Sequence, residues 1–189
     1  MPEVLECQRA GRHMADESER SMCTILFVCT GNTCRSPLAE ALCKKLLADA
    51  LGCPPVEVAA RGFQVVSAGL AALPGGPASL EAVSVAKEFG LDLGGHLSQP
   101  LTEGLIQQAD YIVGMTRHHL RFLEAVPIRE GLVPRLLAAD ASDISDPLGG
   151  ALADYRACAE QIYQGLKEFL LQLQQNGKLP NPSGGADGR

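Results

Sequence analysis

A cysteine and an arginine with five residues between them carry the reactive groups around which this sequence is organised. Cys29 follows four apolar residues, Ile25 to Val28, which predict a buried strand, and Pro37 begins a helical pattern. The residues from Cys29 to Ser36 therefore form a tight strand-to-helix turn. Such a turn directs backbone N–H groups and the positive end of a helix dipole at one place, so it predicts a site for a phosphate-sized anion.

Two side chains make this turn a candidate reactive site. A Cys29 thiol among N–H donors, a helix N-terminus and a guanidinium is favoured as the thiolate, which is the nucleophilic form. Arg35 offers a planar fork that matches two phosphate oxygens. The pair can attack phosphorus and stabilise the oxygens of the transferring group. The alternative, a buried cysteine near a surface arginine, does not explain why strand, Gly31-Asn32, Ser36-Pro37 and helix are in register.

The residue types inside the turn fit a cupped loop. Gly31 and Asn32 tolerate the left-handed backbone that such a loop needs. Ser36 can cap the following helix, and Pro37 suits its first turn, where a missing N–H has no cost.

The segment Val28-Cys-Thr-Gly-Asn-Thr-Cys-Arg-Ser-Pro-Leu-Ala-Glu40 resembles the signature of the low-molecular-weight protein tyrosine phosphatase family. Ser67-Ala-Gly69 and Asp146-Pro147 continue the resemblance, which covers roughly residues 23 to 175. The resemblance implies a single α/β domain of flavodoxin-like fold, with a four-stranded parallel sheet and helices on both faces. It also implies catalysis through a phosphocysteine intermediate, without a metal or another cofactor.

The same resemblance implies roles for individual positions. Cys29 is the nucleophile, Arg35 binds phosphate, and Asp146 donates a proton to the leaving group. Asn32 and Ser67 hold the shape of the loop by hydrogen bonds, and Ser36 helps to expel the nucleophile during hydrolysis. The expected phosphate-binding loop consists of Thr30, Gly31, Asn32, Thr33, Cys34, Arg35 and Ser36.

Three carboxylates, Asp140, Asp143 and Asp146, lie in one loop before the last helical pattern. A general acid must reach over the anion site to protonate the departing atom. Asp146 is the best candidate because Pro147 holds it extended and Gly149-Gly150 permits a tight turn. Asp140 and Asp143 are expected to cap turns or the final helix.

Strand and helix patterns alternate along the chain, which by itself predicts a parallel sheet covered on both sides. Strands are expected at 25–28, 63–69, 111–115 and 133–137, and helices at 38–50, 80–89, 103–108, after Thr116 and at 155–173. Ligands of such sheets bind at the carboxyl ends of the strands, where Cys29 lies. The sequence contains no internal repeat and no sign of a second domain.

Composition narrows the setting. The net charge of −6 argues against nucleic acid and anionic membranes as partners. The sequence lacks a run of about 18 apolar residues, so no membrane-spanning helix is expected. Seven irregularly spaced cysteines do not make a disulfide framework, so a reducing cytoplasm is expected. The expected partner is a phosphorylated protein, and the expected oligomeric state is a monomer because nothing marks an obligate interface.

The two ends differ from the middle of the chain. Residues 1–22 are polar and charged and are expected to form a disordered extension, unless the chain starts at Met14 or Met22. Residues 23–176 are expected to form the phosphatase domain. Residues 177–189 have the composition of a flexible tail.

The remaining cysteines and histidines have less specific signals. Cys34 either packs beneath the anion site or captures a sulfenic acid on Cys29 as a disulfide, which would prevent irreversible oxidation. Cys43 and Cys158 are expected in the core. His96 is expected to be structural, and His118 and His119 are adjacent, so they point in different directions on a helix and do not resemble a metal pair.

Thr33 and Leu148 bear on which phosphorylated side chain the site accepts. Family members that act on phosphotyrosine usually have a bulky aliphatic residue at the position of Thr33 and aromatic residues after Asp-Pro. Thr33 is polar and residues 146–150 contain no aromatic side chain, which resembles the bacterial protein-arginine phosphatase branch, although that branch commonly has Phe at the position of Leu148. A guanidinium brings N–H donors that a hydroxyl and a carboxylate accept, so phosphoarginine is favoured over phosphotyrosine.

Two other functions remain as alternatives. Some arsenate reductases share this fold and loop, but they pass a disulfide outward through further cysteines, and this chain has none between Cys53 and Cys158. Ser36-Pro37 also replaces the Ser-Gln usual in those enzymes. A non-catalytic anion-binding module would have no reason to keep Cys29, Arg35 and Asp146 together.

Overall fold

Four parallel strands form the centre of the molecule, in the order β2-β1-β3-β4. The computed structural model describes residues 22–180. Its strands are β1 (Cys23–Cys29), β2 (Phe63–Gly69), β3 (Tyr111–Gly114) and β4 (Arg135–Leu136). The register places Cys29 beside Gly69 and Val28 beside Gly114, so the central strand ends level with its neighbours. The predicted four-stranded parallel sheet is confirmed.

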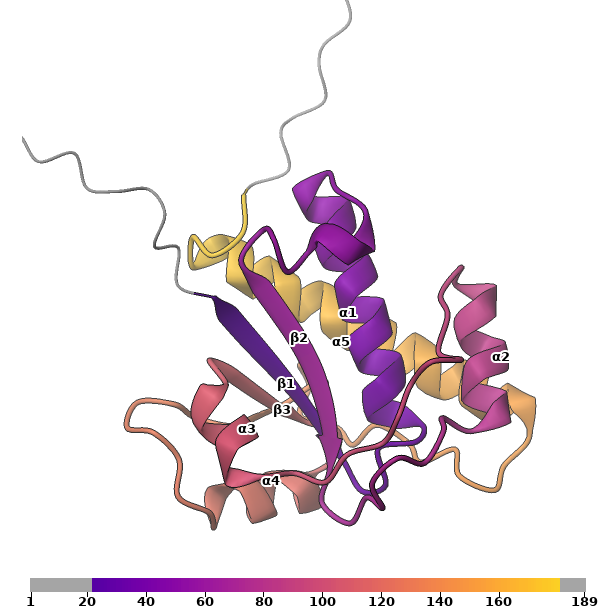
Figure 1. Ribbon diagram of the computed structural model, residues 1–189. Helices are drawn as coiled ribbons and strands as arrows, with labels where there is room; N and C mark the ends of the chain where they lie inside the picture. The colour runs from indigo at the N-terminus through magenta and orange to yellow at the C-terminus, as the bar shows by residue number, and fades with distance from the viewer. Residues whose placement is uncertain (1–21, 181–189) are drawn as a thin grey trace, which may run out of the picture.

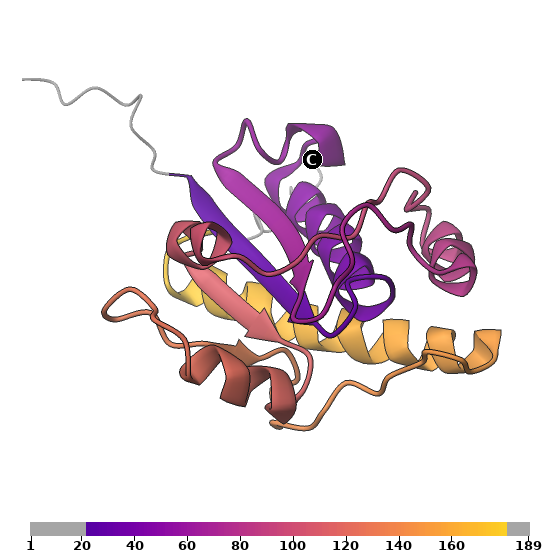
Figure 2. The same cartoon turned by 60° about the horizontal axis from the view of Figure 1, so that its bottom comes forward.

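Helices cover both faces of this sheet (Figures 1 and 2). The helices are α1 (Arg35–Leu51), α2 (Leu80–Glu88), α3 (Glu103–Gln108), α4 (Arg117–Glu124) and α5 (Leu152–Gln175), with a short 3-10 helix η1 (Pro55–Glu57) after α1. α1 and α5 pack together on one face, with α2 beside α5, and α3 and α4 lie on the other. The predicted single α/β domain with helices on both faces is therefore confirmed.

The alternation of side chains along β1 supplies a hydrophobic core on each face. Ile25 and Phe27 belong to the core under α1 and α5, whereas Leu26 and Val28 belong to the core under α3 and α4. All four side chains are fully buried. This explains why the segment before Cys29 is a continuous apolar run and not an alternating one.

The helix boundaries follow local signals in the sequence. α1 ends where Gly52 takes a left-handed φ of 63°, and the side chains of Thr102 and Thr116 cap α3 and α4. The predicted apolar face of α5 is buried throughout, and it consists of Tyr155, Ala159, Ile162, Leu166, Phe169 and Leu173.

Most predicted boundaries are within about three residues of the observed ones, and two differences change the extent of the sheet and of the domain. β4 is shorter than residues 133–137, because its pairing with β3 involves only Arg135 and Leu136 and because Val133 is exposed. At the other end, Leu179 is buried in the core and its N–H bonds to Leu173 O, so the domain continues past residue 176. The predicted extension, apart from Met22, and residues 181–189 of the predicted tail lie outside the described residues.

The end of β2 supports the loop that follows β1. Leu70 N–H donates to Cys29 O and Ala71 N–H donates to Thr30 O, each at a distance of 2.9 Å. A methyl group added at Gly69 would lie 2.6 Å from Thr30 O and 2.9 Å from Asn32 N. These are backbone atoms, which cannot rotate away, so only glycine fits at this position.

Replacing Gly69 should therefore strain the loop. Gly69→Ala is expected to lower the free energy of unfolding by about 1–3 kcal/mol, the usual cost of overpacking. Gly31→Ala is the matched control within the same loop, because its added methyl group would meet only Thr33 Oγ1 at 3.5 Å. The control should change stability by less than about 0.5 kcal/mol. Urea denaturation of both variants tests this, and equal losses would contradict the close approach at Gly69.

Candidate active site

The Cys29 sulfur lies at the C-terminal end of β1 and faces donors from its own turn. It accepts a hydrogen bond from the Asn32 N–H at 3.2 Å and lies 2.9 Å from Ser36 Oγ. α1 begins at Arg35, directly after the turn, so the positive end of its dipole is close to the sulfur. Hydrogen-bond donors and the start of a helix thus surround the sulfur.

Asn32 lies at the centre of the turn and is fully buried. Its Nδ2 donates to Ser36 Oγ and to Ser67 Oγ, each at 2.9 Å, and its Oδ1 accepts from Gln99 N–H at 2.8 Å. Its φ of 54° is left-handed, whereas Gly31 is not in the left-handed region. Of the two residues that tolerate this conformation, Asn32 adopts it and Gly31 does not.

Ser36 faces the sulfur and does not cap α1. The N-cap position belongs to Cys34 and has no side-chain hydrogen bond, which corrects the expected capping role of Ser36. Because Asn32 Nδ2 donates to Ser36 Oγ, the hydroxyl hydrogen of Ser36 is free to point at Cys29 Sγ. The other acceptor within its reach among the described residues, Ala68 O, is 3.4 Å away. Ser36 is therefore placed to donate to the nucleophile.

A chain of hydrogen bonds fixes these directions. Ser67 Oγ donates to Glu40 Oε2 at 2.7 Å, and Lys44 Nζ donates to Glu40 Oε1 at 2.6 Å. A carboxylate only accepts, so Ser67 must donate to Glu40 and receive from Asn32. The Asn32 amide group therefore donates in two directions, through Ser67 to Glu40 and through Ser36 to the Cys29 sulfur.

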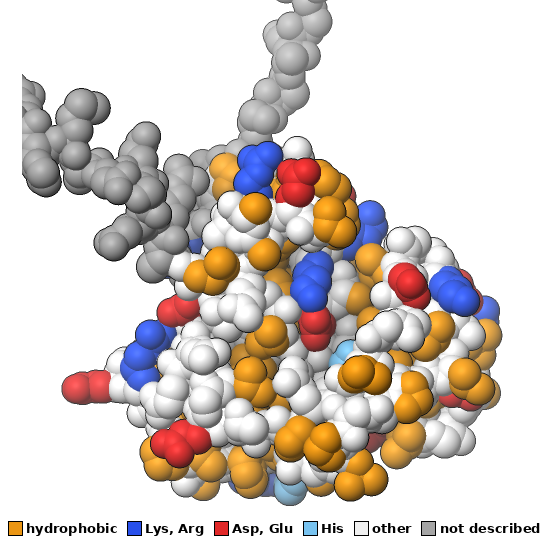
Figure 3. Space-filling model, viewed as in Figure 1, with side chains coloured by type: hydrophobic (Ala, Val, Ile, Leu, Met, Phe, Trp, Pro, Cys, Tyr) orange, Lys and Arg blue, Asp and Glu red, His pale blue; other side chains and the backbone are white. Residues whose placement is uncertain are grey.

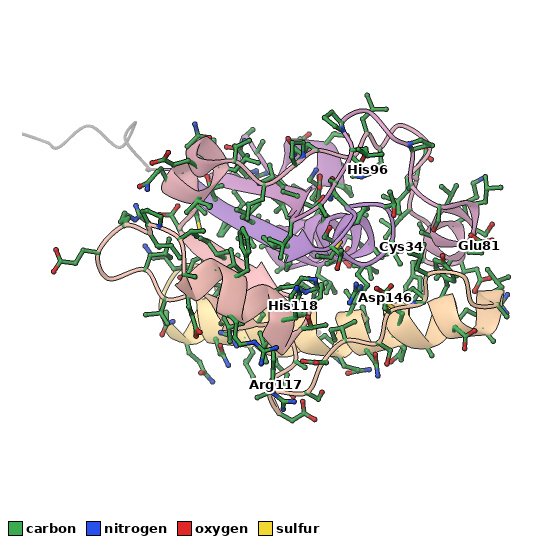
Figure 4. The ribbon with its side chains drawn as sticks, turned by 90° about the horizontal axis from the view of Figure 1, so that it is seen from below. Cys34, Glu81, His96, Arg117, His118 and Asp146 are labelled. Atoms are coloured by element: carbon green, nitrogen blue, oxygen red, sulfur yellow. The ribbon has the colours of Figure 1, made fainter. Side chains whose placement is uncertain are left out.

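Arg35 and Asp146 form an ion pair at the mouth of the turn. The Arg35 guanidinium is buried, and its Nη2 donates to Asp146 Oδ2. Two neutral acceptors, Ile144 O and Thr30 Oγ1, lie 3.5 Å from Nη1 and Nη2, respectively. Asp146 is 47% exposed, so its carboxylate borders both Arg35 and solvent. Figure 4 shows Cys34 between His96 and Asp146, with His118 to the left of Asp146.

The other residues of the carboxylate loop and the predicted selectivity positions are at the periphery. Asp140 Oδ1 accepts from Ser142 N–H and Asp143 Oδ1 accepts from Arg117 N–H, so both shape their loop. Leu148 is 71% exposed and follows Asp146, whose Oδ1 accepts its N–H at 3.2 Å. Thr33 is half-buried, and its carbonyl accepts from Ser79 N–H at 2.9 Å.

The second cysteine of the loop contacts another part of the domain. Cys34 Sγ lies 3.4 Å from Ser79 Oγ and 3.6 Å from Tyr155 OH. Cys34 is thus packed against Ser79 and Tyr155, and all six described cysteines are free. Cys43 and Cys158 are in the core as predicted, where burial raises the pKa of both thiols, that of Cys158 to about 12.

The histidines serve the loop in ways that differ. His96 Nε2 lies 2.8 Å from Asn32 O, which agrees with a structural role.

Within residues 22–180, no group of three His, Cys, Asp or Glu side chains converges to hold a metal ion. In the same part of the chain, none of the helices has the length and apolarity needed to cross a bilayer.

His119 is the neighbour of the loop that the sequence did not reveal. Its side chain is buried, and its Nε2 lies 3.0 Å from Thr30 Oγ1. Burial lowers its pKa to about 4, and the positive charges of Arg35 and His118 act in the same direction. The one available signal was its place three residues after the cap Thr116, where a side chain can reach back to the helix start. The sequence analysis also did not predict that Glu40, Gln99 and Tyr155 contact the loop or the residues that support it.

Comparison with known proteins agrees with this geometry. Residues 24–179 match the family described as low molecular weight phosphotyrosine protein phosphatase. A probable low molecular weight protein-tyrosine-phosphatase, EpsP, from Ralstonia nicotianae is 34% identical over 82% of this chain and 98% of its own length. A protein-arginine-phosphatase from Bacillus subtilis is 33% identical over 80% of this chain and 97% of its own.

Comparison with solved structures also finds phosphatases of this family. The YwlE arginine phosphatase from Geobacillus stearothermophilus has a TM-score of 0.68 and 33% identity, and the match covers 82% of this chain and 94% of that one. The chain therefore belongs to the low-molecular-weight phosphotyrosine protein phosphatase family. It is a cysteine-dependent protein phosphatase, and its relatives include both tyrosine and arginine phosphatases.

The lowered pKa of His119 predicts how stability depends on pH. Between pH 6.5 and about 4 the unfolded chain binds a proton at this residue that the folded protein does not, so stability falls as the pH is lowered. The His119 contribution should amount to about 1–2 kcal/mol between pH 7 and pH 5. Urea denaturation at both pH values measures it, and His119→Gln should remove this part of the dependence. An unchanged pH dependence in the variant would contradict it.

Proposed function

We propose that Cys29, Arg35 and Asp146 hydrolyse phosphate from a phosphorylated protein side chain, with phosphoarginine as the favoured substrate. One observation carries the proposal: the Cys29 sulfur faces the Asn32 N–H and the Ser36 hydroxyl at a helix start, beside the buried Arg35 guanidinium. Backbone N–H groups of residues 30–36 and the Arg35 fork bind the phosphate oxygens. Asn32 and Ser67 keep the loop in shape.

The reaction has two displacements at phosphorus. First the Cys29 thiolate attacks, the bond to the leaving group breaks, and the protonated Asp146 carboxyl gives its proton to the departing atom. A water molecule then attacks the phosphocysteine, Asp146 takes a proton from it, and Cys29 leaves as a thiolate to which Ser36 donates. Orthophosphate is released, and both side chains return to their initial states.

The Arg35–Asp146 ion pair connects binding to this chemistry. Asp146 Oδ2 takes a hydrogen bond from Arg35 Nη2, one of the atoms that would bind a phosphate oxygen. A phosphate that takes over this donor releases Asp146, which is exposed enough to turn to the leaving group. The exposed loop of Asp146 suits such a rearrangement better than the buried Asn32 network does.

Three features support phosphoarginine over phosphotyrosine. Thr33 is polar, residues 146–150 offer no aromatic wall, and relatives named protein-arginine-phosphatase are 33–36% identical to this chain. Leu148 is aliphatic and exposed, at a position where the arginine-phosphatase branch commonly has Phe, so it is not one of these features. Phosphotyrosine hydrolysis remains the second candidate because EpsP is equally similar. Arsenate reduction is not favoured, since no cysteine between Cys53 and Cys158 is present to relay a disulfide.

We also propose a cytoplasmic monomer that needs no cofactor and does not bind nucleic acid, with its phosphatase domain at residues 23–176 extended to Leu179. Free cysteines support a reducing compartment. On the face in Figure 3, basic and acidic side chains are interspersed, without a continuous basic surface for nucleic acid.

The roles of Asp146 as general acid and of Cys29 as nucleophile can be tested separately with a series of aryl phosphates. Asp146→Asn should slow hydrolysis of poor leaving groups by about 10²–10⁴-fold, the usual contribution of a general acid, and affect a nitrophenyl ester less. Cys29→Ser should abolish turnover on every ester and still bind orthophosphate. Equal losses of Asp146→Asn on good and poor leaving groups would assign Asp146 a structural role. Turnover by Cys29→Ser would remove Cys29 as the nucleophile.

Thr33 tests the choice of substrate. Thr33→Ile should keep the loop folded but leave a polar phosphoguanidinium against an apolar side chain. Such a loss costs about 1–3 kcal/mol, or roughly 5- to 150-fold in rate, whereas an aryl phosphate should be tolerated better. We expect wild type to prefer a phosphoarginine peptide and the variant to shift kcat/KM toward phosphotyrosine. Faster cleavage of phosphotyrosine by wild type, with no shift in Thr33→Ile, would reject phosphoarginine but not the phosphatase assignment.

A further inference from the structure

The contact between His119 and Thr30 joins two distant parts of the chain beside the nucleophile. Thr30 directly follows Cys29, and His119 lies in the first turn of α4, 89 residues later. His119 is only 1% exposed, and the function proposed above leaves it without a role. A buried, neutral imidazole at this place therefore needs an explanation.

The hydrogen bonds of the ring fix the position of its proton. His119 Nδ1 lies 3.1 Å from the backbone nitrogen of Thr116, whose N–H can only donate. Nδ1 must then be the acceptor, and in a neutral imidazole the proton lies on Nε2. Nε2–H consequently donates to Thr30 Oγ1 at 3.0 Å.

The Thr30 hydroxyl also accepts from Arg35. Arg35 Nη2 lies 3.5 Å from Thr30 Oγ1 and donates to it and to Asp146. A hydroxyl oxygen has two acceptor sites, so His119 and Arg35 occupy both. Once Asp146 turns to the leaving group, the Thr30 hydroxyl is the side-chain group that still accepts a hydrogen bond from Arg35 Nη2.

We propose that His119 is a positioning residue: it holds the Thr30 hydroxyl as an acceptor for Arg35 Nη2, and so keeps the guanidinium fork aligned on phosphate after Asp146 has moved. The inference rests on the proposed function of Arg35. It assigns a specific task to a residue outside the phosphate-binding loop and makes Thr30 the connection between α4 and the site.

The charges around His119 fit this role. Arg35 and His118 face it with positive charge, and Asp143 and Asp146 with negative charge, and burial is the largest influence on its pKa of about 4. The ring is therefore neutral at physiological pH. A protonated ring would carry a second N–H at Nδ1, which would face the Thr116 N–H.

A purely structural explanation is available, because His119 also completes the capping box of α4 with Thr116. Two variants separate the explanations. His119→Asn keeps a polar atom near the position of Nδ1 and loses the reach to Thr30. His119→Gln reaches the position of Nε2 with an amide N–H and loses the ring acceptor at Thr116.

The experiment measures orthophosphate affinity by calorimetry, kcat and KM for an aryl phosphate, and unfolding in urea. His119→Asn should weaken phosphate binding and lower kcat/KM by about 3- to 10-fold, the worth of one hydrogen bond, and His119→Gln should stay within about 2-fold of wild type. Thr30→Val, at an exposed position, should show the loss of His119→Asn, and the double variant should lose no more. Thr30→Ser should restore binding.

Two results would overturn the inference, and a different result would overturn the proposed function. Normal phosphate binding in His119→Asn with a loss in His119→Gln would reduce His119 to a helix cap, and additive losses in the double variant would show that it does not act through Thr30. Either result overturns the inference and leaves the proposed function intact. Wild type that binds orthophosphate but hydrolyses no phosphorylated substrate would overturn the proposed function alone, because the affinity measurements need no turnover.

Discussion

The left-handed backbone of Asn32 is the constraint on which the turn between β1 and α1 depends. A non-glycine residue in this conformation costs of order 1–3 kcal/mol and persists only where its surroundings require it. Here Ser36, Ser67, Gln99 and His96 all bond to Asn32, which is fully buried. A glycine would turn the chain at lower cost but would bring no side chain to direct the Ser36 hydroxyl at Cys29.

The second constraint is the buried positive charge of Arg35. A guanidinium that is 4% exposed needs acceptors, since an unpaired buried charge is strongly destabilising. Asp146 meets this need from an exposed loop, and Thr30 Oγ1 and Ile144 O supply two further acceptors, each 3.5 Å from a guanidinium nitrogen. The site thus combines a rigid side, built around Asn32, with an exchangeable side at Asp146. This division suits an enzyme that must hold phosphate and still release a proton donor to the leaving group.

The sequence determined the fold and the reactive pair because their signals are local. The apolar run before Cys29, the turn, and the helix start at Arg35 are contiguous, so their order alone creates the anion site. The caps Thr102 and Thr116 and the face of α5 are likewise readable from neighbouring residues. Asp146 was selected among three carboxylates of one loop by Pro147 and Gly149-Gly150 beside it, together with the family resemblance.

Tertiary structure decided which residues besides Asn32 and Ser67 support the loop and in which direction each hydrogen bond runs. Glu40 lies in α1, Gln99 in the segment before α3, and His119 in α4. Nothing in the local sequence marks Glu40 or Gln99, and the position of His119 after the cap Thr116 indicates its contact with the helix start but not its contact with Thr30. The left-handed conformation falls on Asn32 and not on Gly31, because only the Asn32 side chain finds buried partners on β2 and beyond it. Ser36 became a donor to sulfur instead of a helix cap for the same reason. A hydrogen bond depends on the positions of both partners in space, and chain order specifies those positions only for near neighbours.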